Sequence, residues 1–94
     1  MDIILQEKTR TVITEKGPVH LTGKEFGILS FLMENAGNTV SAEDIYRAVW
    51  DAEPFDCHLV ISVHIRHIRE KIEKNPSRPD HVKVFWGKGY CFNA

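Results

Sequence analysis

One stretch of sequence decides the fold of this chain: HLVISVHIRHIREKIEKN, residues 58–75. Four isoleucines recur in it at a spacing that places their side chains on one side of an α-helix. Two prolines and several turn formers close the helix between Asn75 and Asp80. The stretch therefore predicts a helix from about His58 to Asn75 with one buried side. The buried seam is Ile61, Ile65, Ile68 and Ile72, and the opposite side presents Leu59, Val63, Arg66, His67, Glu70 and Lys74, flanked by His64, Lys71 and Arg69.

A β-hairpin is predicted directly after this helix. Val82–Trp86 and Tyr90–Phe92 are rich in the β-branched and aromatic residues that favour strands. Gly87-Lys88-Gly89 joins them, and its glycines tolerate the positive φ of a tight turn. We therefore expect a hairpin over residues 81–92.

A second helix is predicted before the long one. Its start signal is the segment 41–44, and Ile45, Val49 and Trp50 are spaced to point toward the interior or its edge. The helix should stop near Asp51. Residues 51–56 are acidic, contain a proline and lack periodicity, so they predict a loop.

The first helix follows a small sheet. Residues 1–21 alternate apolar and polar positions with a break at Gly17-Pro18, which predicts antiparallel strands. Thr22 and Glu25 then form the pattern of a capping box, in which each side chain satisfies a free backbone N–H. The helix should run to about Asn35, with Gly37 placed to end it in a left-handed conformation.

The order of sheet, three helices and hairpin predicts an α+β fold. It is the order of a winged helix-turn-helix, whose last helix enters the major groove while the hairpin reaches a neighbouring groove. With 94 residues the chain can build one hydrophobic core, so we expect one domain, residues 1–94.

Composition favours a cytoplasmic protein. No run approaches the roughly 20 apolar residues that cross a bilayer, and the first residues do not resemble a secretory signal. Cys57 and Cys91 lie far apart without CxxC spacing, which favours free thiols in a reducing compartment over a disulfide.

Net charge restricts how the chain could bind nucleic acid. Its 12 Lys and Arg against 13 Asp and Glu give −1 with neutral histidines, whereas nucleic-acid-binding proteins usually carry a basic excess. Any DNA-binding face must therefore be local. Five histidines add a conditional positive charge, because an imidazole beside a phosphate can be protonated near neutral pH.

Several local strings, taken in order, resemble the OmpR/PhoB-type effector domain of bacterial response regulators. The resemblance covers essentially the whole chain, including the N-terminal sheet that most winged helices lack. The strings are Leu21-Thr22 with Glu25-Phe26, Ser41 through Val49-Trp50, Val63-His64-Ile65-Arg66 with Arg69, and Gly87-Lys88-Gly89-Tyr90.

The resemblance implies an output domain of a two-component phosphorelay that regulates transcription. A receiver domain or its cognate kinase system would switch it in the full-length protein. Such domains bind direct repeats of double-stranded DNA as tandem homodimers. Their loop between the second and third helices often contacts RNA polymerase, and here that loop is Asp51 to Cys57, with Asp51, Glu53, Phe55 and Asp56 as candidate contacts.

The resemblance also implies which residues contact DNA. Arginine and lysine neutralise phosphates, and tryptophan and tyrosine can donate to a phosphate oxygen. Valine can pack against a thymine methyl group. The implied backbone contacts are Trp50, His64, Arg66, Arg69 and Tyr90, the implied base contacts are Val63 and His67, the turn from Trp86 to Lys88 lies at the minor groove, and Lys71 borders the helix face.

The chain departs from the family at three places. Leu59-Val60 stands where Arg-Thr is common, and neither residue can hold a phosphate. His67 and Trp86 each occupy a position where arginine is frequent. Together they remove about three contacts, each worth on the order of 1–3 kcal/mol, which implies weak, altered or lost DNA binding.

Other classes of function fit the sequence less well. A winged helix that mainly contacts RNA polymerase or a dimer partner is the principal alternative, because Leu59, Val60 and Val63 could form a protein-binding patch. His64 and His67 with Cys57 lack a fourth ligand for a metal, and the chain needs no cofactor. No catalytic carboxylate pair, nucleophile with its base, or phosphate loop indicates an enzyme. Trp50 could equally be a structural aromatic.

Overall fold

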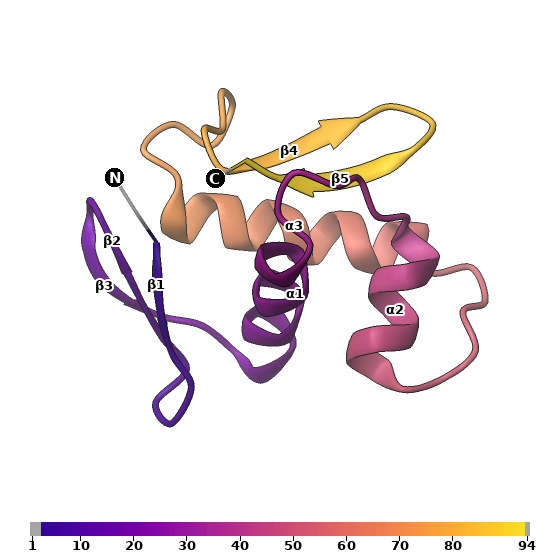
Figure 1. Ribbon diagram of the computed structural model, residues 1–94, viewed down its shortest axis with the longest axis horizontal. Coiled ribbons are helices and arrows are strands. Elements are labelled where there is room, and N and C mark those ends of the chain that lie inside the picture. Colours follow the sequence, from indigo (N-terminus) through magenta and orange to yellow (C-terminus); the bar gives the residue numbers. More distant parts are fainter. Residues whose placement is uncertain (1–2, 94) are drawn as a thin grey trace.

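The computed structural model describes residues 3–93 and contains three helices and two small antiparallel sheets in those residues (Figure 1). The predicted order of elements and the α+β class are confirmed. The elements are β1 (Ile4–Gln6), β2 (Thr11–Thr14), β3 (Gly17–His20), α1 (Gly23–Glu34), α2 (Ala42–Trp50), α3 (His58–Ile72), β4 (Val82–Phe85) and β5 (Gly89–Phe92).

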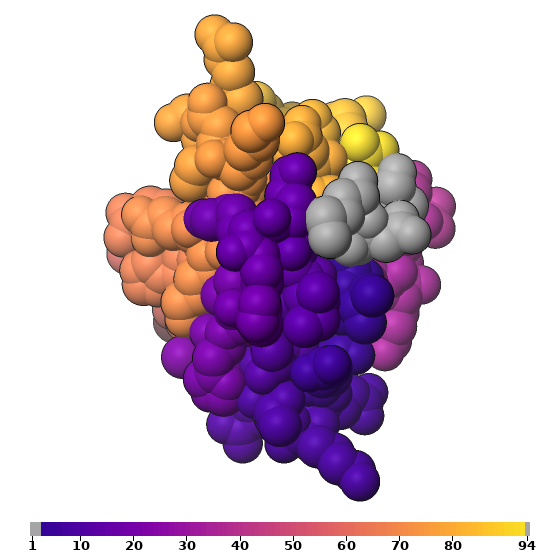
Figure 2. All heavy atoms as spheres, turned by 90° about the vertical axis from the view of Figure 1, so that its left-hand side faces the viewer, coloured from indigo at the N-terminus to yellow at the C-terminus, as the bar shows by residue number. Residues whose placement is uncertain are grey.

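The N-terminal sheet and the C-terminal hairpin lie on different sides of the helices (Figure 1). The sheet has the order β1-β2-β3, and its antiparallel register pairs Val12 with both Leu5 and Val19. Figure 2 looks onto the side where this sheet lies, with the segment that follows α3 rising above it. Lys16 ties the sheet to the end of α3, because its Nζ donates to the backbone oxygens of Glu70 and Glu73 at 3.2 and 3.4 Å.

The isoleucine seam of α3 is the centre of the core, as predicted. All four isoleucines are at most 1% exposed, and they pack with buried residues of α1 and α2. Burying one such side chain contributes about 1.5–3 kcal/mol. The seam therefore fixes the rotation of α3 about its axis and with it the set of residues that face solvent. Its partners include Leu21, Ile28, Leu29, Leu32 and Ile45.

The predicted start signals of α1 and α2 are both present. Thr22 accepts a hydrogen bond from the Glu25 backbone N–H, and Glu25 accepts one from the Thr22 N–H, which completes the capping box. Ser41 caps α2 by accepting from the Asp44 N–H at 3.0 Å. Gly37 has the predicted left-handed conformation, with a φ of +86°, but it lies two residues beyond Asn35, the residue that caps the end of α1.

The predicted end of α3 was wrong by three residues. The helix stops at Ile72, and Glu73 adopts an extended backbone with a ψ of 142°. Its buried carboxylate accepts hydrogen bonds from the backbone N–H groups of Asp80, His81 and Val82. These bonds draw the chain away from the helix axis and lead it into β4, so Lys74 lies in the connection and not on the helix face.

Candidate nucleic-acid interface

The face of α3 opposite the isoleucine seam is directed to solvent. Arg66 is exposed, and Val63, His64 and His67 are partly exposed. Leu59, at the start of the helix, is 74% exposed. The structure thus gathers the predicted backbone-contacting and base-contacting residues of α3 on one accessible face.

Positive charge is concentrated in the part of the chain that carries this face. Residues 58–94 contain seven Lys and Arg against three Asp and Glu, whereas residues 1–57 contain five against ten. The net charge of −1 is therefore the sum of a basic C-terminal part and an acidic N-terminal part. A polyanion would be attracted to α3 and the hairpin, and repelled by much of the rest.

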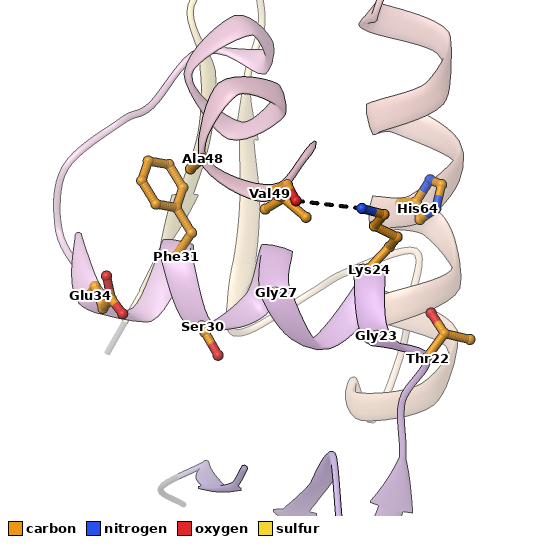
Figure 3. Close-up of a pocket in the computed structure, with 10 residues that line it drawn as sticks. All are labelled: Thr22, Gly23, Lys24, Gly27, Ser30, Phe31, Glu34, Ala48, Val49 and His64. Atoms are coloured by element: carbon orange, nitrogen blue, oxygen red, sulfur yellow. Dashed lines mark hydrogen bonds between the residues drawn. The ribbon is translucent and has the colours of Figure 1, made fainter. Parts of the chain in front are cut away.

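A cluster around Trp50 joins all three helices. The Trp50 ring stacks on Tyr46 with centroids 4.9 Å apart and meets the edge of His64 at 5.3 Å. Lys24 lies over the Trp50 ring at 5.0 Å, and its Nζ donates to the Val49 carbonyl at 3.5 Å (Figure 3). Trp50 is half-buried, so it supports the helices and still reaches the surface.

His64 has one ring nitrogen already engaged. Its Nδ1 lies 2.7 Å from the Val60 carbonyl oxygen, so this nitrogen carries the proton and donates it. Nε2 is left as the nitrogen that can bind another group. A phosphate oxygen would be met through this nitrogen, and a phosphate contact is the role that the resemblance implies for His64.

Arg69 ties α3 to the hairpin. Its Nε donates to the Val82 carbonyl at 2.9 Å, and within residues 3–93 its buried Nη2 has no hydrogen-bond partner. Burial lowers the pKa of Arg69, against the opposing effect of Glu73 and Tyr90. Burial raises the pKa of Tyr90, and Arg69 beside it acts in the opposite direction. These two residues border the exposed face and help to hold the hairpin.

Lys71 is paired within the protein. Its Nζ lies 2.6 Å from Oε1 of Glu25, and Nδ1 of His67 lies 3.9 Å from Oε2 of the same carboxylate. Burial alone would raise the pKa of Glu25, but the hydrogen bonds from Lys71 and Thr22 outweigh it and lower the pKa below its ordinary value. Glu25 therefore links the start of α1 to α3 while it is ionised.

We expect Glu25→Gln to lower the free energy of unfolding by about 1–2 kcal/mol at pH 7, because it removes a charge-assisted pair. A carboxylate with a depressed folded pKa stabilises the fold above its unfolded pKa, and this contribution is lost as the pH falls through the folded pKa. The difference between wild type and variant should therefore shrink from about pH 5 downward. Urea unfolding at several pH values measures it. Exposed Glu34→Gln is the control, and a difference that stays constant with pH would contradict this role.

The hairpin is fixed against the start of α2. Val40 and Tyr90 exchange two backbone hydrogen bonds of 2.8 and 2.9 Å. A groove of about 740 Å³ separates the hairpin from the starts of α2 and α3, and it is lined in part by Leu59, Phe85 and Trp86. On its rim His58 pairs with Glu43 at 2.7 Å. The exposed Trp86 and Lys88 lie in the turn of the hairpin.

The loop between α2 and α3 projects away from the core. Asp51 ends α2 in the left-handed conformation, with a φ of 53°. Phe55 is 90% exposed, whereas Cys57 is 2% exposed and anchors the end of the loop. The loop thus presents an aromatic ring among acidic residues, in the segment that the resemblance implies for a contact with RNA polymerase.

The comparisons with known proteins agree with this geometry. Residues 15–92 match the family described as "Transcriptional regulatory protein, C terminal". The chain belongs to this family. Among its relatives is the DNA-binding dual master transcriptional regulator RpaA of Synechocystis, which is 49% identical over 73 residues that cover 78% of this chain and 30% of RpaA.

Solved structures place the chain with the OmpR/PhoB-type effector domains. The response regulator DrrB of Thermotoga maritima, an OmpR/PhoB homologue, matches with a TM-score of 0.85 and 36% identity over 100% of this chain and 42% of its own. The DNA-binding domain of Klebsiella pneumoniae RstA, solved in complex with the RstA box, shares the fold with a TM-score of 0.86 at 22% identity, over 99% of this chain and 92% of its own. This chain spans less than half the length of RpaA and DrrB.

Two residues of this effector domain make contacts that sequence patterns did not predict. Lys24, in the first turn of α1, lies over the ring of Trp50, 26 positions away in sequence. Glu73 falls within the helix predicted over residues 58–75, and its side chain is fully buried. Neither contact is local in sequence, so helical periodicity carried no signal for it.

Two further findings concern the described residues 3–93. They contain no group of three His, Cys, Asp or Glu side chains placed to hold a metal ion. None of their helices combines the length and the apolar character that a membrane crossing requires.

Proposed function

We propose that this OmpR/PhoB-type effector domain regulates transcription by binding double-stranded DNA, with α3 in the major groove and the β4–β5 hairpin as its wing. One observation carries the proposal: the isoleucine seam turns the face with Arg66, His64 and Val63 to solvent in the basic part of the chain. An exposed helix of this kind beside a hairpin is the arrangement that reads a major groove.

The proposed contacts divide into positioning and reading. Arg66, His64 and Trp50 would contact phosphates, and Lys24 joins them because it lies over the Trp50 ring. Val63 and His67 would face base edges, where valine can meet a thymine methyl and a neutral imidazole can accept from or donate to one base.

Arg69, Lys71 and Tyr90 would contact the DNA backbone from the border of the face. Tyr90 is bonded to Val40 only through its backbone. The side chains of Arg69 and Lys71, by contrast, are already engaged inside the protein, by the Val82 carbonyl and by Glu25. Their contributions should therefore be smaller than that of Arg66, whose side chain is exposed.

The family assignment supports several further partners. By the OmpR/PhoB pattern, the domain would bind direct repeats as a tandem homodimer and would be joined to a receiver domain in the full-length protein. The same pattern places the protein in the cytoplasm. RNA polymerase would meet the loop between α2 and α3, through Asp51, Glu53, Phe55 and Asp56. The exposed Phe55 ring gives that contact an apolar anchor.

Contact with proteins alone is less well supported. The near-neutral net charge favoured that alternative, but it divides into a basic C-terminal part and an acidic N-terminal part. The family and its relatives are transcriptional regulators. RpaA, a DNA-binding regulator, is 49% identical to this chain in the matched region.

Selection from pooled random duplex DNA, followed by sequencing of the bound fraction, tests the proposal. We expect enrichment of a short direct repeat, and binding through about four phosphates should give a log–log salt slope near −3.6. Arg66→Ala should flatten this slope by about 0.9 and weaken binding to all sequences alike.

Lys8→Ala is the matched control for Arg66→Ala, because it removes an exposed positive charge from the turn between β1 and β2. It should leave the slope close to that of the wild type. A sequence-selective loss in Arg66→Ala would contradict its phosphate role. No enrichment at low salt and slightly acid pH, where histidines are charged, would contradict DNA binding itself.

A further inference from the structure

Two adjacent aromatic rings are exposed at the end of the hairpin. Trp86 is 89% exposed and Phe85 is 47% exposed. Across the groove, Leu59 of α3 is 74% exposed and lines the same hollow. Single exposed apolar residues are common, but a contiguous set beside a proposed binding face usually marks a contact surface.

The hairpin presents these rings on a supported backbone. The Lys88 N–H donates to the Phe85 carbonyl at 2.9 Å, which closes the turn that carries Trp86. In β5, the backbone N–H and C=O of Tyr90 both form hydrogen bonds with Val40. The turn of the hairpin lies on the side where α3 begins (Figure 1), and Trp86 in that turn lines the groove together with Leu59 of the first turn of α3.

Charge indicates the kind of partner that these rings meet. Residues 81–92 contain Lys83 and Lys88 and no Asp or Glu. Glu43 lines the same groove from the start of α2, but it is paired with His58 at 2.7 Å. An exposed aromatic ring on a hairpin that carries lysines and no acidic residue suits a polyanion whose interior is apolar, which is the character of a DNA duplex. A neutral apolar protein surface would leave Lys83 and Lys88 without an anionic partner.

We propose that Trp86 is an apolar wedge that enters the minor groove beside the α3 site, partly unstacks one base step and bends the duplex. This inference rests on the proposed DNA-binding function. Apolar side chains inserted from the minor groove kink DNA by about 20–90°. Pyrimidine–purine steps unstack most easily, so the wedge selects such a step next to the direct repeat.

Bending of a duplex that carries the selected repeat tests the wedge. The probe is labelled at both ends, and energy transfer between the labels reports the distance between them with protein bound. Trp86→Ala should abolish most of the bend, weaken binding about tenfold and remove the enrichment of pyrimidine–purine steps beside the repeat. The salt slope should not change, because no charge is removed.

Three variants separate the wedge from other roles. Trp86→Phe keeps an apolar ring and should keep the bend in the DNA. Trp86→Arg adds a positive charge, so it should steepen the salt slope, but it should not bend the DNA as wild type does. Ile4→Ala truncates an exposed apolar side chain on β1 and should behave as the wild type. Thermal melting of each variant should be nearly unchanged, since these side chains are largely exposed.

The outcomes distinguish the wedge from the proposed function. If Trp86→Ala selects the same repeat with the same bend and flanking steps, the wedge is wrong and DNA binding stands. If it instead lowers binding of RNA polymerase while the bend is retained, the surface is a protein contact and the wedge is again wrong. If the wild type selects no repeat, both the wedge and the proposed DNA-binding function are wrong.

Discussion

Replacing Glu73 with alanine is expected to lower the free energy of unfolding by about 3–5 kcal/mol. The side chain is fully buried, and its two oxygens accept hydrogen bonds from the backbone N–H groups of Asp80, His81 and Val82 at 2.8–3.2 Å. Alanine would leave the buried Val82 N–H and the partly buried Asp80 and His81 N–H groups without this acceptor, and Arg69 without its nearby negative charge. Because a folded domain of this size is stable by only about 5–15 kcal/mol, the loss would be a large fraction of the total.

Thermal and urea unfolding measure the effect of Glu73→Ala. Each kcal/mol should shift Tm by about 4–8 °C in a domain of this size, so the midpoint should fall by more than about 12 °C. Glu73→Gln keeps one acceptor oxygen, so its Tm should lie between those of wild type and Glu73→Ala. Glu70→Ala, which changes an exposed glutamate one turn earlier in α3, is the control and should stay within about 0.5 kcal/mol of wild type. Equal losses in Glu73→Ala and Glu70→Ala would contradict the role of Glu73.

The parts of the fold that the sequence predicted are those encoded by local patterns. The spacing of the α3 isoleucines depends only on helical geometry, and the caps at Thr22 and Ser41 involve residues three positions apart. The C-terminal end of α3 depends instead on bonds from Glu73 to residues seven to nine positions later. A glutamate on a helix pattern is usually solvated, so nothing in its neighbourhood marked this one as buried.

The candidate site follows the same division. The spacing of the buried isoleucines predicted that Val63, Arg66 and His67 lie on the opposite face of α3, and in the structure they do. The engagement of Arg69 by the Val82 carbonyl and of Lys71 by Glu25 could not be predicted, because both partners are distant in sequence. Sequence left Trp50 between a structural and a binding role, and its stacking on Tyr46 beside the accessible Lys24 allows both.

Replacing Gly89 with alanine is expected to destabilise the domain by about 3 kcal/mol and to release the wing. Gly89 has a φ of +145°, which only glycine adopts easily, and a Cβ added there would lie 2.0 Å from the Val40 carbonyl oxygen. The backbone would have to move, and the two hydrogen bonds between Val40 and Tyr90 would be lost. Urea unfolding and binding to the selected duplex measure the two effects.

Gly87→Ala separates backbone strain from this contact. Gly87 also has a positive φ, of +79°, but a Cβ there would meet no atom within 4 Å, so the cost should be only about 1 kcal/mol. If the Val40 contact holds the wing, Gly89→Ala should lose both stability and DNA bending, while Gly87→Ala keeps most of each. Similar losses in the two variants would mean that strain in the turn dominates and that the bridge to α2 does little. The comparison therefore tests whether the hairpin acts as a fixed extension of the helix-turn-helix, because the bridge joins β5 to the residue just before the α2 cap.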